Sequence, residues 1–180
     1  MCQVEADGSR IFSWIVREFS EGVRHLNRSE RYLAATRSFQ NERPSMATNF
    51  DELISGFCKL KQLDNGDELA AGAPLSVNGA CCSLIYNKAL AADVVFLYVE
   101  YAYAPLDRLA AIYKKLLRQN HLDFDGHGPG YCISPTNGKI VELTRLALSD
   151  LTPDRLAGTL VKHATRWQRW CDKNLPESTI

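Results

Sequence analysis

The chain lacks any long run of hydrophobic residues. Its longest strongly apolar run, Val94 to Val99, has six residues, whereas a helix that spans a bilayer needs about 20. The first ten residues carry Glu5 and Asp7 where a secretory signal peptide would be basic, and the apolar stretch 11–16 is too short for a signal core. The sequence therefore predicts a cytoplasmic protein that does not insert into membranes.

The chain also lacks net charge. Lys and Arg total 21 and Asp and Glu total 21, so the formal net charge at neutral pH is zero. A protein that binds nucleic acid or an anionic membrane usually carries an excess of basic residues, so the overall charge favours neither partner. In a cytoplasmic protein the six cysteines are expected to be reduced thiols.

Spacings typical of metal sites are missing as well. Cys81 and Cys82 are adjacent and would face opposite sides of a strand, whereas zinc ligands usually come as C-x2-C. The one crude cluster, His121 and His127 around Asp123 and Asp125, lies in a Gly-rich segment, where solvated side chains are the more ordinary interpretation. We expect no bound metal.

Catalytic and cofactor motifs are equally scarce. The glycines at 126, 128 and 130 are followed by a strand pattern and by no Gly-Lys-Ser/Thr, so they do not form a phosphate-binding loop. Cys132 and His127 could form a nucleophile pair, but nothing in the sequence fixes their geometry. We expect no catalytic residue, no cofactor and no enzymatic activity.

The sequence does contain clear signals for where helices and strands begin and end. Asn49 and Glu52 form a capping box at the start of an apolar stripe, and Asn78-Gly79 is a hairpin signal. Thr152-Pro153-Asp154 is a helix start. The predicted order is helix, three strands, helix, two strands, helix, at residues 50–63, 74–78, 81–86, 94–103, 105–122, 131–134, 139–146 and 152–173. This order predicts an α+β fold with a mostly antiparallel sheet flanked by helices.

Two of these elements are more apolar than one packing surface requires. Strand 94–103 is apolar on both sides, so it needs cover on both faces, from its own monomer or from a partner. Helix 105–122 has an apolar band wider than one face, which indicates two neighbours. We expect a homodimer seated on this helix with help from strand 131–133, through Leu109, Ile112, Tyr113, Leu116, Tyr131 and Ile133.

Residues 1–45 differ from the rest of the chain. All seven of their basic residues are Arg, an apolar stripe fits one helix between Ile11 and Leu26, and the segment closes at the polar stretch 41–45. Met46 then directly precedes a helix start. Two interpretations remain open: a genuine N-terminal helical extension, or a misassigned leader before a protein that begins at Met46. The predicted domain is 46–180.

The order of elements, together with several short motifs, resembles the class I type III secretion chaperones of the Tir chaperone (CesT-like) family. Pro105 opens the second helix, and Leu116-Leu117-x-x-Asn120 resembles the family's ending of that helix. Gly130-Tyr131-Cys132-Ile133 is similar to the short strand that follows, and Asn137-Gly138-Lys139-Ile140-Val141-Glu142-Leu143 to the next turn and strand. A last amphipathic helix ends in Trp167 and Trp170. The resemblance covers about three quarters of the chain.

The resemblance implies a small homodimer that binds the N-terminal region of one or more secreted effector proteins and keeps it competent for export, without cofactor or ATP. Components of the secretion apparatus are further implied partners. Apolar residues of the first helix and the sheet are the candidate effector-binding surface: Phe50, Ile54, Leu75, Val77, Ile85 and Leu97. Two alternatives stay open, a small cytoplasmic enzyme with a site at loop 123–132 and a dimeric adaptor unrelated to secretion.

Overall fold

The computed structural model describes residues 49–122 and 128–175, all within one unit of the chain, Thr48–Ile180. The predictions for the N-terminal extension, for Met46 as a start, for residues 123–127 of the Gly-rich loop and for the tail 176–180 lie outside the described residues. Among the described helices, none is long and apolar enough to cross a membrane.

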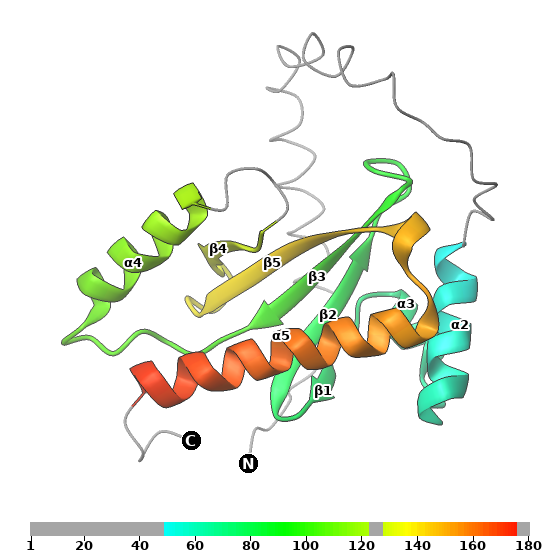
Figure 1. Cartoon of the computed structure of the whole chain (residues 1–180), viewed down its shortest axis with the longest axis horizontal. Helices are drawn as coiled ribbons and strands as arrows, with labels where there is room; N and C mark the ends of the chain where they lie inside the picture. Colours follow the sequence, from blue (N-terminus) through cyan, green and yellow to red (C-terminus); the bar gives the residue numbers. More distant parts are fainter. Residues whose placement is uncertain (1–48, 123–127, 176–180) are drawn as a thin grey trace, which may run out of the picture. The chain divides into compact units, whose positions relative to one another are not determined.

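A five-stranded antiparallel sheet forms the centre of the fold (Figure 1). Its strand order is β1-β2-β3-β5-β4, so β2, β3 and β5 lie inside the sheet and β1 and β4 at its edges. The strands are β1 (Leu75–Val77), β2 (Ala80–Tyr86), β3 (Val94–Glu100), β4 (Gly130–Ile133) and β5 (Ile140–Ala147).

The helices confirm the α+β prediction and add two short elements to it. The predicted helices are α2 (Phe50–Lys61), α4 (Leu109–Leu122) and α5 (Pro153–Asn174), and the additional elements are the short helix α3 (Gly66–Ala70) and the 3-10 turn η1 (Leu148–Asp150). The sequence Asp64-Asn65-Gly66-Asp67 was expected only to end the first helix. It does end α2, but Gly66 and Asp67 also begin α3, because acidic residues are favourable in a first helical turn.

The start of α4 corrects the prediction for Pro105. This proline does not lie in the first helical turn, because its carbonyl accepts a hydrogen bond from the Arg108 N–H at 3.0 Å and closes a tight turn before the helix. The first hydrogen bond that leads into α4 runs from the Ile112 N–H to the Arg108 carbonyl at 2.9 Å. The helix therefore begins at Leu109, and Leu106 is left in the turn.

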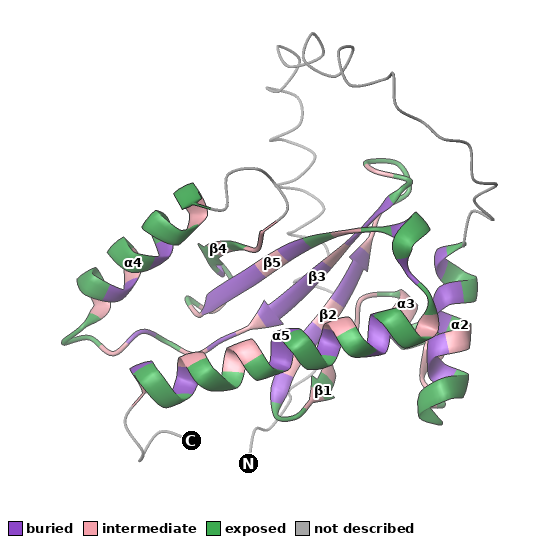
Figure 2. Ribbon diagram, in the orientation of Figure 1, coloured by how far each residue is buried: buried purple, intermediate pink, exposed green. Residues whose placement is uncertain are grey.

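The main core lies between one face of the sheet and helices α2 and α5. Val95, Leu97 and Val99 of β3 point into it and are fully buried, as are Leu156 and Leu160 of α5. Figure 2 shows the buried stripes of α2 and α5 and the buried length of β3. Val94 and Tyr98 on the opposite face of β3 are buried too, so the prediction that this strand is covered on both faces is confirmed.

Helices α2 and α5 approach each other closely where Gly56 faces Pro153. A Cβ atom at Gly56 would lie 2.7 Å from the Cγ of Pro153, which is closer than real Cβ contacts. The absence of a side chain at Gly56 therefore permits this contact, and the contact fixes how the first helix meets the start of the last one.

Candidate protein-binding surface on α4

Helix α4 has an inner and an outer apolar side. On the inner side Ile112 and Leu116 are buried and belong to the main core. On the outer side Leu117 is 68% exposed. Leu122 at the end of the helix is 75% exposed and projects to the side of Lys114 and Arg118. Figure 2 shows α4 exposed along most of its length. Because large apolar side chains seldom gather on a free surface, this outer side is a candidate binding surface.

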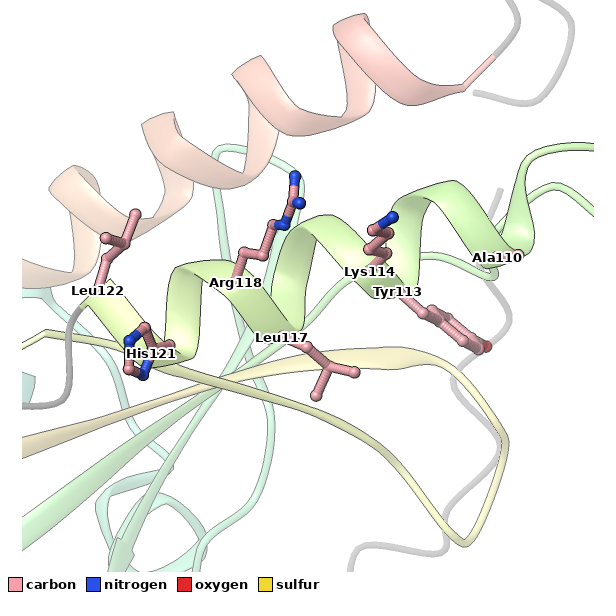
Figure 3. Close-up of a pocket in the computed structure, with 7 residues that line it drawn as sticks. All are labelled: Ala110, Tyr113, Lys114, Leu117, Arg118, His121 and Leu122. Atoms are coloured by element: carbon pink, nitrogen blue, oxygen red, sulfur yellow. The ribbon is translucent and has the colours of Figure 1, made fainter.

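A hollow of about 650 Å³ follows the outer side. The described residues that border it all come from α4: Ala110, Tyr113, Lys114, Leu117, Arg118, His121 and Leu122. Figure 3 shows Tyr113 and Leu117 projecting to one side of the helix and Lys114 and Arg118 to the other. The surface thus combines an apolar stripe with a basic flank. We call it the α4 outer surface, defined by Ala110, Tyr113 and Leu117.

Two polar contacts hold α4 in place. The Asn120 side chain donates to the Tyr131 carbonyl at 2.8 Å and accepts from the Tyr131 N–H at 2.7 Å, so it pairs with β4 as a neighbouring strand would. At the other end, the Arg108 guanidinium donates to the Asn174 carbonyl near the end of α5. Helix α4 is therefore tied to an edge strand and to the last helix.

Aromatic packing supports the same junction. The Tyr101 ring makes edge-to-face contacts with Tyr131, with ring centroids 6.2 Å apart, and with Trp170, with centroids 5.2 Å apart. Such pairs contribute about 0.5–1.5 kcal/mol each beyond their buried area. The α4 outer surface is thus presented on a rigid support.

Four of the six residues expected at the dimer interface lie on α4, and two, Tyr131 and Ile133, lie on β4. Ile112 and Leu116 are buried in the core, so they do not offer an interface in this arrangement. Leu109, Tyr113 and Tyr131 are half-buried against the core, and Ile133 is 41% exposed. The most exposed apolar residues, Leu106, Leu117 and Leu122, were not among the six, because the sequence shows a wide band without showing which part of it the sheet covers.

The six residues expected to bind an effector are mostly inside the fold. Phe50, Ile54 and Leu97 are at most 2% exposed and belong to the main core, and Ile85 is buried at 5%. Leu75 and Val77 on β1 remain half-buried. Phe50 stacks on Tyr86 with ring centroids 4.5 Å apart, which explains why its place in the stripe is structural. The structure therefore reduces the candidate effector surface to the β1 edge.

A buried polar cluster that the sequence did not reveal lies between β5 and α5. Glu142 is fully buried and accepts hydrogen bonds from the Tyr101 hydroxyl at 2.6 Å and from Arg166 Nη1 at 3.0 Å, and it also contacts His163 Nδ1. Burial alone would raise the pKa of Glu142, but hydrogen bonds from His163 and Tyr101 and the nearby charges outweigh it and lower that pKa. The carboxylate is therefore held ionised. No spacing pattern predicts this cluster, because its members are far apart in the sequence.

The thiols of Cys58, Cys82, Cys132 and Cys171 have raised pKa values. Burial raises the pKa of Cys82 to about 12 and that of Cys171 to about 11. Desolvation also raises the pKa of the Cys132 thiol, although the residue as a whole is exposed. A nucleophilic cysteine needs the opposite shift. His127, the suggested partner of Cys132, lies outside the described residues.

No group of three or more His, Cys, Asp or Glu side chains that could hold a metal ion occurs within residues 49–122 and 128–175. The suggested cluster around His121 and His127 falls largely on residues 123–127, outside that part.

The α4 outer surface is the feature of the described structure that best suits a functional contact.

Comparison with known proteins adds no relative. No protein-family model matches this chain, and no curated protein matches it with significant sequence similarity.

Proposed function

We propose that the protein is a homodimeric chaperone of type III secretion, which binds the N-terminal region of one or more effector proteins and keeps it competent for export. The observation that carries this proposal is the α4 outer surface, an apolar stripe held rigidly on the fold. The resemblance of residues 46–173 to the Tir chaperone family supplies the secretion role. The α+β fold is compatible with that family.

A second copy of the chain is the occupant that suits the α4 outer surface. In a two-fold dimer the same patch faces itself, so a patch needs only to be self-complementary. Leu117 is 68% exposed, and two such stripes packed side by side would cover each other. Because Asn120 and Arg108 already fix the helix, dimerisation would cost little ordering entropy.

The β1 edge suits an extended effector segment. Among the described residues β1 pairs only with β2, so its outer backbone N–H and C=O groups are free for a further strand. Leu75 and Val77 point to one face there and are half-buried. Strand addition of this kind gains affinity from main-chain hydrogen bonds and specificity from alternate side chains.

Limited proteolysis of an effector fragment tests the chaperone role. The full chain would be used to capture partners from its own cells, and the N-terminal fragment of each captured protein would be made separately. The expected result is that the purified chain protects one N-terminal fragment from protease while the far-UV spectrum of that fragment shows no folding to a globular domain. Protection of a folded domain only, or of no fragment, would contradict the proposal.

Two variants locate the effector site in the same assay. Val77→Asp on the β1 edge should abolish protection, because it places a charge where an apolar side chain would dock. Val77 also packs against the core, so circular dichroism must show that the variant keeps its fold. Leu60→Asp is the matched control, since Leu60 is exposed on α2 and lies outside the proposed surfaces. Equal loss in both variants would show that the fragment does not bind at β1.

A further inference from the structure

A second hollow lies at the end of β5, away from the α4 outer surface. It has a volume of about 430 Å³ and is bordered by the last residues of β5, by η1 with Leu151, and by the first half of α5. Its charged lining residues are three cations and one acid, Arg145, Arg155, Lys162 and Asp150, all exposed. The hollow is therefore basic, although the whole chain is neutral.

The three cations have no carboxylate partner in the described part of the chain. The ion pairs there join Lys139 to Glu100, and His163 and Arg166 to Glu142. Arg155 donates to the backbone carbonyl of Asp150 at 3.1 Å, which holds its guanidinium beside the hollow without neutralising it. The charges of Arg145, Arg155 and Lys162 thus remain available to a ligand.

The basic character continues along α5. At about 100° per residue, four basic side chains fall within roughly 40° of one another on the helix, and they span about 27 Å of its length. The two acids of the helix, Asp154 and Asp172, lie about a quarter turn away from them. The members of this α5 basic stripe are Arg155, Lys162, Arg169 and Lys173. Arg166 lies on the same side but is paired with Glu142.

The space beside the stripe is open because Gly158 has no side chain. A Cβ atom there would meet nothing within 4 Å, and Gly158 borders the hollow together with Thr159. The stripe is long enough for about eight residues of extended chain at about 3.3 Å each. The described lining contains no aromatic residue, whereas sites for single-stranded nucleic acid usually stack bases on aromatic rings.

We propose that this hollow and the α5 basic stripe bind an acidic, extended segment of a protein partner. The hollow anchors one end of the segment through Arg145, Arg155 and Lys162, and the stripe holds the rest by charge. The proposal does not rest on the chaperone function or on the dimer, because its elements differ from the α4 outer surface. It would stand if the chain proved monomeric.

Fluorescence anisotropy with a designed peptide tests this site. The probe is a fluorescein-labelled peptide of about ten residues with alternating Glu and Ser, and the control peptide has Gln in place of Glu. The full chain should bind the acidic peptide and not the neutral one, and binding should weaken as salt is raised. Equal binding of both peptides, or no binding of the acidic one, would overturn the proposal.

Variants separate a defined site from diffuse attraction. Lys162→Glu should weaken binding at least about tenfold, and Gly158→Met should weaken it as well, because it fills the hollow without changing charge. Lys61→Glu at the end of α2 is the control with the same change of charge, and it should alter binding less than about twofold. A Lys61→Glu effect as large as that of Lys162→Glu would overturn the site.

Two further measurements complete the test. Sedimentation of Lys162→Glu should give the same oligomeric state as the parent chain, so a loss of peptide binding cannot be a loss of dimer. A labelled oligothymidylate of matched charge should bind more weakly than the acidic peptide. Equal or tighter binding of the oligonucleotide would show that the groove is not specific for acidic protein segments.

Discussion

Glu142 is a fully buried carboxylate paired with two side chains of α5. Replacing it with Gln keeps its shape but leaves the Arg166 guanidinium without its counter-charge and the His163 ring without its carboxylate contact. We expect Glu142→Gln to lower the free energy of unfolding by about 3 kcal/mol, as when one partner of a buried ion pair is removed. Urea denaturation measures this loss. Glu52→Gln, on the exposed side of α2, should change stability by less than about 0.5 kcal/mol.

The same carboxylate gives the protein a defined acid sensitivity. The pKa of Glu142 is lowered in the folded state, so the ionised group stabilises the fold above its unfolded pKa of about 4.3, and this contribution is lost as pH falls through the folded pKa. Ionised Glu142 therefore contributes to the difference in unfolding free energy between the parent chain and Glu142→Gln at and above about pH 5. This difference should shrink as the solution is made more acidic, which denaturation at several pH values would show. A difference that grows at low pH would contradict this account.

At the scale of elements, two glycines in helices should respond in opposite ways to alanine. Gly56→Ala gains helix propensity, but its Cβ would lie 2.7 Å from Pro153 Cγ, so the contact between α2 and α5 must open. We expect a net loss of about 1–3 kcal/mol. Gly158→Ala in α5 meets no such neighbour and should gain about 1 kcal/mol. Thermal denaturation of both variants tests the pair, and equal signs would refute the contact.

Caps and turns explain why most elements could be predicted from the sequence. Asn49 accepts a hydrogen bond from the Asp51 N–H at 3.4 Å, and Thr152 accepts one from the Arg155 N–H at 3.2 Å. The start of each of these two helices is therefore determined by residues close together in the sequence. Asn78 and Gly79 both adopt positive φ in the β1–β2 turn, as their residue types favour. These features depend on neighbours in sequence, and sequence therefore reveals them.

The functional surface could be predicted only in part, because it depends on packing between distant segments. The apolar band of α4 indicates two neighbours, but only the packing shows that Ile112 and Leu116 face inward and Leu117 faces outward. The stripe of α2 gives no sign that Phe50 and Ile54 are core rather than groove. The basic hollow is likewise formed by residues of β5 and α5. No spacing pattern in the sequence predicts that these residues lie next to each other.

At the scale of the whole molecule, the α4 outer surface predicts the oligomeric state. The parent chain should be a dimer at micromolar concentration. Leu117→Asp should weaken association by at least about 2 kcal/mol, because it replaces an apolar side chain that the dimer would bury with a charged one. Sedimentation velocity would measure the shift to monomer, and circular dichroism would confirm that the variant is folded. A parent chain that remains monomeric would contradict the prediction.

The charge of α4 predicts how salt acts on that dimer. The helix carries Lys114, Lys115 and Arg118 and has no acidic residue, so two copies would bring like charges together at the edge of the interface. Raising salt from about 50 mM to about 500 mM should therefore strengthen association, since screening reduces the repulsion. Sedimentation at both concentrations decides this point. Weaker association at high salt would mean that acidic residues of other elements face α4.

The strand order also has a consequence for how the chain folds as it is made. Strand β3 pairs with β5, so Glu100 meets Val141 and Val94 meets Ala147, partners more than forty residues apart. At about 5–20 residues per second, synthesis leaves this edge of β3 unpaired for seconds after it emerges. During that time the sequence VVFLYV is an uncharged strand of high β-propensity, the type of segment that aggregates. A protein that is proposed to protect an effector segment would therefore expose an aggregation-prone strand of its own while it is being synthesised.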